Sequence, residues 1–486
     1  MSIRIYNTLT RQKEEFVPVE EGRVRMYVCG PTVYDLLHVG NFRGAIFFNL
    51  VRNWLEHRGY RVDFVYNYTD IDDKIINKAQ SEGKSALDVS SHFIDEFEKD
   101  YAALGLPPHT HNPKCSDHMD DMIRFIEDLI DNGHAYEIDG SVFYSIASFE
   151  RYGKLSGKNI EDLEAGHRVD PDVRKRDPLD FILWKPAKEG EPYWESPWGR
   201  GRPGWHIECS AMNHSFLGDQ IDIHGGGIDL IFPHHENEIA QTEGKTGKPF
   251  AKYWMHNNFI QFGDQKMSKS LGNVVKARDF MERYHPEILK FVILDAHYRS
   301  PLNMGEDIVR QKMQGLSRIY EAVKLADTIL MKDKGPAEPA AGFQAKCREK
   351  REEIERALDD DFNTPQVFAA IFDVIRAFND IAFNKKITAV QQANARAFKQ
   401  VIDDYGRILS MLREPAVEFL DRLNRILVQE KGLDAHKIQQ LVDARTAARR
   451  DKDFQRSDAL RDELAGMGVE LKDAPDGTHW QIKIGE

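Results

Sequence analysis

The sequence predicts a multidomain α/β plus all-α protein, in which a parallel-sheet domain split by an insertion precedes a helical region and a small C-terminal domain. Three observations support this prediction. A strand–helix–strand pattern lies between residues 24 and 68, an irregular stretch fills 105–200, and helical periodicity dominates from about residue 305. With 486 residues, the chain is also too long for a single hydrophobic core.

The first strand is expected at 24–30, an apolar and β-branched stretch that runs into a Gly-Pro pair. Apolar side chains then recur at helical spacing over 42–57, and this helix should stop at Gly59. Residues 61–68 predict a second strand. A strand, a crossover helix and a strand form the opening unit of a parallel sheet.

The α/β pattern breaks off and then resumes near Gly204. We interpret the Gly-, Pro- and Trp-rich residues 105–200 as an insertion. Residues 220–224 predict a short strand, and three glycines separate it from a helix that should begin near Pro233. Ligands of such sheets bind beyond the carboxyl ends of the strands, which is where residues 29–30 should emerge.

The expected domain boundaries follow from these patterns. The parallel-sheet domain is made of two halves, with the insertion between them, and the helical region and the C-terminal domain come after it. The predicted ranges, in chain order, are 1–118, 119–203, 204–305, 306–420 and 421–486.

Composition excludes several classes of protein. No run of 18 apolar residues is present, and the first residues lack the apolar core of a secretory signal, so we expect a cytoplasmic protein with no membrane partner. The net charge of −13 argues against a protein that coats nucleic acid indiscriminately, but it permits binding of one structured RNA through a basic face. The four cysteines lie far apart and do not form a disulfide framework.

A candidate metal site involves residues that are distant in sequence. His234 and Glu238 lie four residues apart on a predicted helix and share one face, and Cys29 and Cys209 lie upstream. Two thiolates, an imidazole and a carboxylate suit tetrahedral zinc. The same residues fit a second interpretation, with core cysteines and a solvent-facing His/Glu pair. A helical zinc-protease motif is disfavoured, because it needs a second His where Glu238 stands.

Two further motifs indicate a family. His38-Val39-Gly40-Asn41 follows the first strand, and residues 266–270 read Lys-Met-Ser-Lys-Ser. They resemble the HIGH and KMSKS signatures of class I aminoacyl-tRNA synthetases. Further stretches resemble the cysteinyl-tRNA synthetase family in particular, and the resemblance covers nearly the whole chain. These stretches are 67–74, 202–209, 232–238, 359–365, 461–464 and 477–480.

The resemblance implies a Rossmann-like catalytic domain, a helical-bundle domain that binds tRNA and a C-terminal anticodon-recognition domain. It implies a cysteine–tRNA ligase that activates L-cysteine with ATP as cysteinyl-adenylate, forms AMP and diphosphate, and charges tRNA(Cys). We expect a monomer without an editing domain. Mg²⁺ would accompany ATP, and one Zn²⁺ would be held by Cys29, Cys209, His234 and Glu238.

The resemblance also assigns the remaining site residues. ATP binding and catalysis fall on the two signatures, namely on His38, Asn41, Lys266, Ser268 and Lys269. The amino-acid pocket falls on Thr69, Trp205, His224 and Asp229. Asp229 would pair with the substrate ammonium, and Trp205 would close over its side chain. The alternatives are a helix cap at Asp229 and a core role for Trp205.

One departure from the family pattern concerns the first signature, which usually ends in a second His. An amide such as that of Asn41 donates a hydrogen bond but carries no charge. The alternative role for Asn41 is that of a helix cap.

The C-terminal tail is predicted to read the anticodon. A basic stripe is expected there, with Trp480 available to stack on an unpaired base, although a solvated helix face has the same pattern. The stripe consists of Arg445, Arg449, Arg450, Lys452 and Arg456. This tail disfavours the nearest rival, a cysteine ligase of the mycothiol pathway. A catalytically dead RNA- or zinc-binding relative is disfavoured by the intact signatures.

Overall fold

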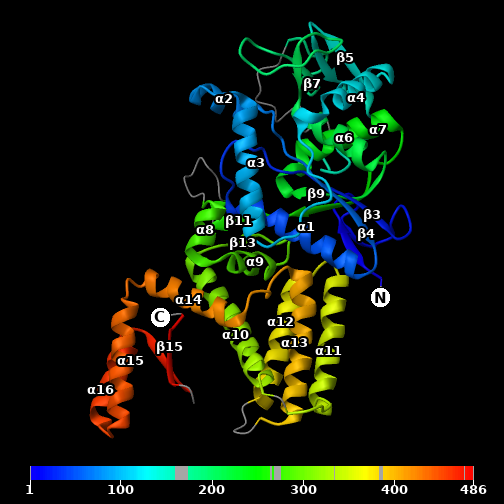
Figure 1. Cartoon of the computed structure of the whole chain (residues 1–486). Coiled ribbons are helices and arrows are strands. Elements are labelled where there is room, and N and C mark those ends of the chain that lie inside the picture. The colour runs from blue at the N-terminus through cyan, green and yellow to red at the C-terminus, as the bar shows by residue number, and fades with distance from the viewer. Residues whose placement is uncertain are drawn as a thin grey trace.

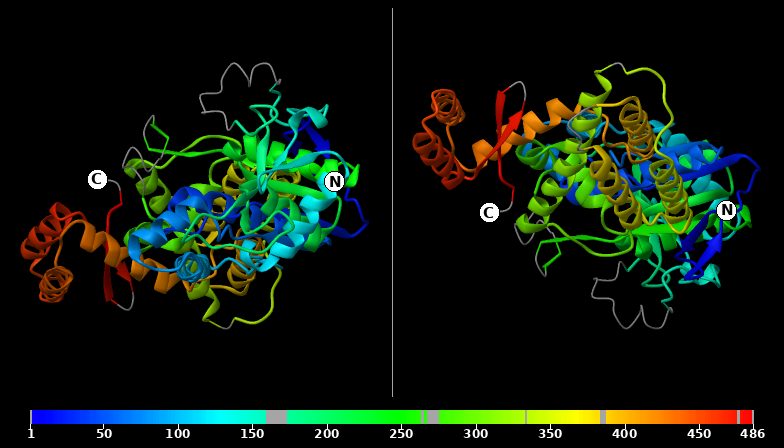
Figure 2. Two further views of the ribbon diagram at one scale, coloured as in Figure 1. Left: turned by 90° about the horizontal axis from the view of Figure 1, so that it is seen from above. Right: turned by 90° about the horizontal axis from the view of Figure 1, so that it is seen from below.

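The computed structural model describes residues 2–158, 173–262, 265–266, 275–332, 334–382, 387–474 and 477–484. An α/β domain occupies the centre of the molecule, with the insertion at one end and a helical bundle at the other (Figure 1). The last helices and a hairpin project to one side of the bundle, and both further views show them standing apart from the body (Figure 2). Within the described residues, no helix combines the length and the apolar character needed to cross a membrane.

The central sheet confirms the predicted parallel α/β fold. Its four strands are all parallel, and α1 (Val39–His57) crosses over from the first to the second of them. The strand order is β10 (Ala251–Asn257), β9 (Ile221–Gly227), β3 (Arg23–Val28) and β4 (Arg61–Tyr66). The chain order reverses between β9 and β3, so ligands are expected at the carboxyl ends of these two strands.

The sheet is covered on both faces, and β3 shows the period of two that this requires. Val24, Met26 and Val28 join the apolar core that extends under α1 into the helical bundle. Tyr27 belongs to the opposite core, which lies under α6 (Trp205–Leu217) and the insertion. From Met26 onward β3 is therefore buried, whereas Arg23 and Arg25 near its start are partly exposed.

The insertion is more regular than the sequence indicated. Its described part contains a four-stranded antiparallel sheet, packed beside a helix. These elements are α4 (Met119–Asp131), β5 (Ala135–Ile138), β6 (Ser141–Tyr144), β7 (Phe181–Pro186) and β8 (Gly201–Pro203).

Seven long helices follow residue 305 in the described chain, which agrees with the predicted all-α region. They are α10 (Glu306–Leu330), α11 (Ala341–Asp359), α12 (Thr364–Ala382), α13 (Ala389–Leu409), α14 (Ala416–Glu430), α15 (Ala435–Arg450) and α16 (Phe454–Gly466). α14 continues through residue 420, where a domain boundary is predicted. The tail, for which no strands were predicted, is an antiparallel hairpin of β14 (Val469–Ala474) and β15 (Gly477–Ile482).

The remaining elements connect or flank the sheet. On the amino-terminal side they are β1 (Arg4–Asn7), β2 (Gln12–Glu15), α2 (Asp73–Glu82), α3 (Ala86–Ala103), and the short helices Cys115–His118 and Ile146–Ser148. After β9 come η3 (Ile228–Leu230), η4 (Ile231–His235), α7 (Glu236–Thr246), β11 (Ile260–Phe262), β12 (Gln265–Lys266), α8 (Ala277–Tyr284), α9 (Pro286–Leu294) and β13 (Leu302–Asn303).

Candidate active site

Four potential metal ligands converge at the carboxyl ends of β3 and β9. Cys29 follows β3, Cys209 lies in α6, and a short turn and the first part of α7 contribute His234 and Glu238. The two sulfur atoms are 3.7 Å apart, and Glu238 Oε1 lies 3.3 Å from the Cys29 sulfur and 3.1 Å from His234 Nε2. A tetrahedral zinc ion with Zn–S bonds of about 2.3 Å separates two sulfurs by about 3.8 Å. The donor atoms therefore have the spacing that zinc requires.

A second set of donors overlaps the first. Cys29 and Glu238 also lie close to His224 and His235, with one donor atom of each residue within 4.8 Å of the others. However, His224 Nε2 is hydrogen-bonded to Glu238 Oε2 at 2.8 Å, and His235 Nε2 is 3.9 Å from Glu238 Oε1. The set with two sulfurs suits zinc better, since thiolates are its preferred soft ligands. His224 then supports Glu238 rather than binding the ion.

Burial sets the protonation of this cluster. It raises the pKa of the Cys29 thiol well above its usual value, and the neighbouring Cys209 and Glu238 add to this effect. It lowers the pKa of His234 to about 3, which leaves a neutral imidazole. Although burial opposes it, the nearby His224 and His234 hold the pKa of Glu238 below its usual value. A divalent cation would stabilise both thiolates, because metal ligation deprotonates a coordinating thiol.

Two aromatic side chains fix the ring of His234. Trp205 stacks on it with ring centroids 4.4 Å apart, and His206 Nδ1 lies 2.9 Å from His234 Nδ1. Such contacts to the second ring nitrogen orient a ligating histidine. Trp205 remains 40% exposed, so one face of its indole is accessible.

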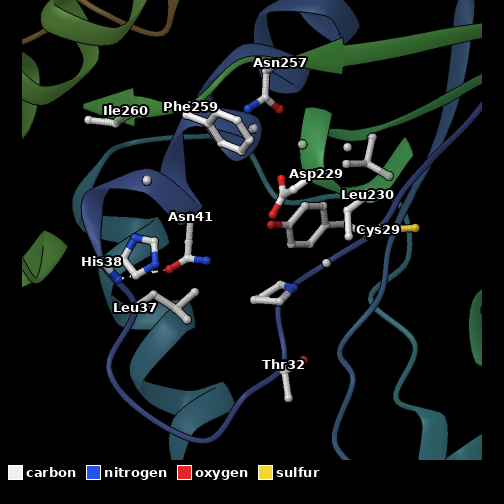
Figure 3. A pocket seen from close by; sticks show the side chains of 18 of the residues that line it. Cys29, Thr32, Leu37, His38, Asn41, Asp229, Leu230, Asn257, Phe259 and Ile260 are labelled. Carbon is white, nitrogen blue, oxygen red and sulfur yellow. Dashed lines mark hydrogen bonds between the residues drawn. The ribbon is translucent and has the colours of Figure 1, made fainter. Parts of the chain in front are cut away.

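A pocket connects this cluster to the start of α1. Figure 3 shows His38 and Asn41 on one wall and Asp229 and Leu230 on the opposite one. Cys29 and Trp205 also line the pocket, which brings the metal cluster to its edge. Thr69 and His224 are buried behind it: the backbone of Thr69 pairs with pocket-lining Thr32, and His224 bonds to Glu238.

Asn41 has a clear structural role. Its Oδ1 accepts a hydrogen bond from the backbone N–H of His38, the N-cap residue of α1, at 3.1 Å. The amide nitrogen of Asn41 faces the pocket in Figure 3. The expected helix cap is therefore present, and the side chain also presents its donor to the cavity.

The second signature lies close to the first. Lys266 ends β12, but its side chain and the whole of Ser268 and Lys269 lie outside the described residues. On the far side of this segment, Val39 N–H donates to the carbonyl of Val275 at 3.0 Å, and Ala277 N–H donates to that of Leu37 at 2.9 Å. The chain that follows the second signature is thus paired with the backbone of the first.

Several histidines of this region have no role that was predicted from the sequence. His235 Nδ1 lies 2.8 Å from His256 Nε2, and His256 Nδ1 lies 2.8 Å from Thr8 Oγ1. His256 stands near the carboxyl end of β10, and the rule that ligands bind at strand ends identifies such a position. His206 is adjacent to Trp205 within one of the stretches that carried the resemblance.

Comparisons with protein families cover most of the chain. The model of the "tRNA synthetases class I (C) catalytic domain" matches residues 15–314. The "DALR domain" matches 353–413, and the "Cysteinyl-tRNA ligase anticodon binding domain" matches 432–480.

Curated relatives and solved structures agree with these matches. The cysteine–tRNA ligase of Bdellovibrio bacteriovorus is 50% identical over 481 residues, 99% of each chain. That of Geobacter sulfurreducens is 46% identical over 99% of this chain and 100% of its own. Among solved structures, Mycobacterium tuberculosis methionyl-tRNA synthetase in complex with methionyl-adenylate superposes with a TM-score of 0.60 at 14% identity, over 85% of this chain and 95% of its own. This last likeness concerns the fold alone.

Proposed function

The chain belongs to the cysteinyl-tRNA synthetase family, and from this premise we propose that it charges tRNA(Cys) by a zinc-dependent route through cysteinyl-adenylate. Its activity as a cysteine–tRNA ligase follows from full-length relatives of that name. The observation that carries the finer proposal is the Cys29–Cys209–His234–Glu238 cluster at the edge of the pocket that His38 and Asn41 line.

The metal cluster accounts for the choice of cysteine. Pocket shape alone separates such similar substrates as cysteine and serine by only ~1–3 kcal/mol. A zinc ion held by the four ligands would supply a soft position that a substrate thiolate prefers to a serine hydroxyl. Mg²⁺ would accompany ATP without dedicated protein ligands.

The other amino-acid contacts come from the pocket wall. Asp229 is exposed in η3 and carries the negative charge that a substrate ammonium needs. Trp205 has one face on His234 and lines the pocket, so it is placed to cover the substrate side chain. We assign a supporting role to Thr69 and His224, because both are buried behind the lining.

For adenylate formation, we assign the α-phosphate to the start of α1. The substrate carboxylate is itself the nucleophile, so the reaction needs positioning and stabilisation of charge on the phosphate oxygens. His38, the Asn41 amide and the helix N-terminus offer hydrogen-bond donors there. By the family pattern, Lys266, Ser268 and Lys269 hold the remaining phosphates. The second step transfers cysteine to the ribose of the terminal adenosine of tRNA.

The projecting C-terminal elements are assigned to the anticodon, with one revision of the predicted contacts. Trp480 packs against the core, and its indole N–H donates to Gln439 Oε1 at 2.9 Å. Arg445 is only 8% exposed, so it is not part of the basic stripe that was predicted. Phe454, in contrast, is 65% exposed beside exposed Lys452 and Arg456. Phe454 is therefore the better candidate to stack on an unpaired base.

The test is cysteine-dependent exchange between ATP and pyrophosphate, measured with and without a zinc chelator. We expect exchange with cysteine but not with serine, loss of exchange on zinc removal and recovery when zinc is restored. Cys209→Ser should lower both zinc content and exchange, whereas Cys347→Ser, buried in α11 away from the site, should lower neither. A fully active metal-free enzyme would refute zinc dependence. Charging of an amino sugar instead of tRNA would favour the mycothiol-pathway rival.

A further inference from the structure

One buried arginine of α1 binds no acidic side chain in the described part of the chain but is surrounded by backbone. Arg43 lies two positions after Asn41 and is 1% exposed. Its guanidinium donates to five main-chain carbonyls at distances of 2.5–3.3 Å. The acceptors are Asn258, Phe259, His297, Tyr298 and Ser300.

The guanidinium of Arg43 stays positively charged although it is buried. Desolvation lowers the pKa of Arg43 to about 10, which still leaves the guanidinium protonated at neutral pH. The five carbonyl dipoles replace water around the two terminal nitrogens of the cation. The next residue, Gly44, allows α1 to come close to the side chain of Asn257, because a Cβ there would lie only 3.1 Å from Asn257 Oδ1.

The two segments that Arg43 joins have different positions in the active site. Residues 257–260 form a wall of the pocket and continue into β11. Residues 297–300 lie outside the pocket lining and precede β13, which pairs with β11. β11 also pairs with β12. Arg43 therefore binds the backbone just before β11 and β13, two paired strands of this three-stranded sheet.

We propose that Arg43 is a positioning residue for adenylate formation, which holds the 257–260 wall of the pocket at a fixed distance from His38 and Asn41. This inference rests on the proposed function. A planar fork with donors on both terminal nitrogens reaches two separate backbone segments at once, whereas an ammonium is a single point of donation. Loss of the fork should let the pocket wall shift relative to the phosphate-binding end of α1.

A purely structural arginine on the same helix provides a matched control. Arg52 is 5% exposed, and its guanidinium donates to the carbonyls of Pro107 and Pro108 and to Asn49 Oδ1. None of these residues lines the pocket. Replacement of Arg43 or Arg52 by Met therefore removes a buried guanidinium of the same kind. Only the Arg43 change removes one that is hydrogen-bonded to a wall of the pocket.

The experiment compares wild type, Arg43→Met, Arg43→Lys and Arg52→Met, all as zinc-loaded full-length enzyme. We measure kcat for ATP–pyrophosphate exchange, the Kd for cysteine by titration calorimetry, zinc content and the thermal midpoint. We expect kcat to fall about 100-fold in Arg43→Met, the order expected for a displacement of about 1 Å, with Kd for cysteine within twofold. Arg43→Lys should fall about tenfold, and Arg52→Met should keep the wild-type kcat despite a lower midpoint.

Each outcome is decisive. Equal kcat values for Arg43→Met and Arg52→Met would overturn the inference, and so would a wild-type rate for Arg43→Lys. If Arg43→Met does not fold, Arg43→Lys alone decides, by the ratio of its kcat to that of wild type. Absence of cysteine-dependent exchange in the wild type would instead refute the proposed function.

Discussion

Asn41 combines two tasks that the sequence presented as alternatives. Its Oδ1 caps α1 through the His38 backbone, and its amide nitrogen faces the pocket. A histidine at this place, as the family pattern has it, offers the same pair of groups, one ring nitrogen as acceptor and one as donor. The asparagine therefore preserves the hydrogen-bonding groups of a histidine, but unlike a histidine it cannot carry a positive charge.

Substitutions at position 41 separate the two tasks. Asn41→Asp keeps the acceptor for the cap but turns a negative charge toward the pocket, so we expect exchange kcat to fall by about 100-fold with little change in thermal midpoint. Asn41→His should stay within a few-fold of wild type. Exchange kinetics and calorimetry on the three proteins check this prediction. An aspartate variant as fast as wild type would show that the amide donates nothing to the reaction.

At the scale of elements, the turn after β3 tolerates no side chain next to the first metal ligand. A Cβ on Gly30 would lie 1.7 Å from the backbone oxygen of Asn67, while Gly30 N–H donates to Asn67 Oδ1 at 2.9 Å. Gly30 thus allows β3 and the chain after β4 to approach closely, and this approach places Cys29.

We expect Gly30→Ala to displace this turn, lower zinc stoichiometry and destabilise the protein by ~1–3 kcal/mol, the usual cost of overpacking. Gly342→Ala is the matched control, because nothing lies within 4 Å of its added Cβ and it stands in α11. That change should be neutral or stabilising by up to ~1 kcal/mol. Metal analysis and thermal unfolding measure both effects. Wild-type zinc content and midpoint in Gly30→Ala would contradict the close packing of this turn.

The elements also show what the sequence could not predict. The strand–helix–strand unit was predictable, because β3, α1 and β4 are local and strongly apolar. The sheet of the insertion was not, since its strands are short and 36 residues separate the end of β6 from the start of β7. The C-terminal hairpin was not predicted either, because β14 contains several charged residues and lacks a clear apolar strand pattern. The helix expected near Pro233 starts as an α-helix only at Glu236, because the glycines extend β9 and short turns follow.

For the whole molecule, the position of α14 decides where the chain can be cut. Phe419 of α14 stacks on Tyr320 of α10 with ring centroids 3.8 Å apart, so α14 packs on the bundle. A chain that ends at Gly432 keeps this helix, whereas one that ends at 420 divides it. We expect the chain that ends at Gly432 to keep ATP–pyrophosphate exchange near the wild-type rate and to charge tRNA poorly. Undiminished charging would show that the projecting elements do not contribute to tRNA recognition.

The stability of the protein should fall in acid, partly through His109. Burial lowers the pKa of His109 to about 3, and nearby Arg52 adds to this effect. The unfolded chain takes up this proton near pH ~6.5 while the folded chain does not, so His109 reduces stability by up to ~1.4 kcal/mol per pH unit as pH falls from 6.5 toward 3.

Unfolding measured between pH 6 and 5 tests this contribution. His109→Gln should make the loss of stability per pH unit smaller by about 1 kcal/mol. The same replacement of His436, which is exposed on α15, serves as the control. Identical pH slopes in wild type and His109→Gln would contradict a neutral buried imidazole.

The site could be predicted only in part from the sequence. The four metal ligands were candidates by residue type, but only the resemblance selected them over core cysteines, since no local spacing joins Cys29 to Cys209. Their distances depend on the parallel pairing of β3 with β9, although the rest of the first half-domain and the whole insertion lie between these two strands in the sequence. The hydrogen bonds of Arg43 could not be predicted from the sequence, because its partners are backbone carbonyls and any residue can provide one.

The discontinuity of the cluster bears on how a newly made chain matures. During translation, Cys29 leaves the ribosome long before α7 brings His234 and Glu238, and β9 cannot dock beside β3 until the insertion has been made. A nascent chain halted within the insertion therefore exposes an unprotected thiol at Cys29 and lacks the other three donors. Metal uptake, which is coupled to folding in such sites, would mark the moment at which the catalytic half-domains have joined.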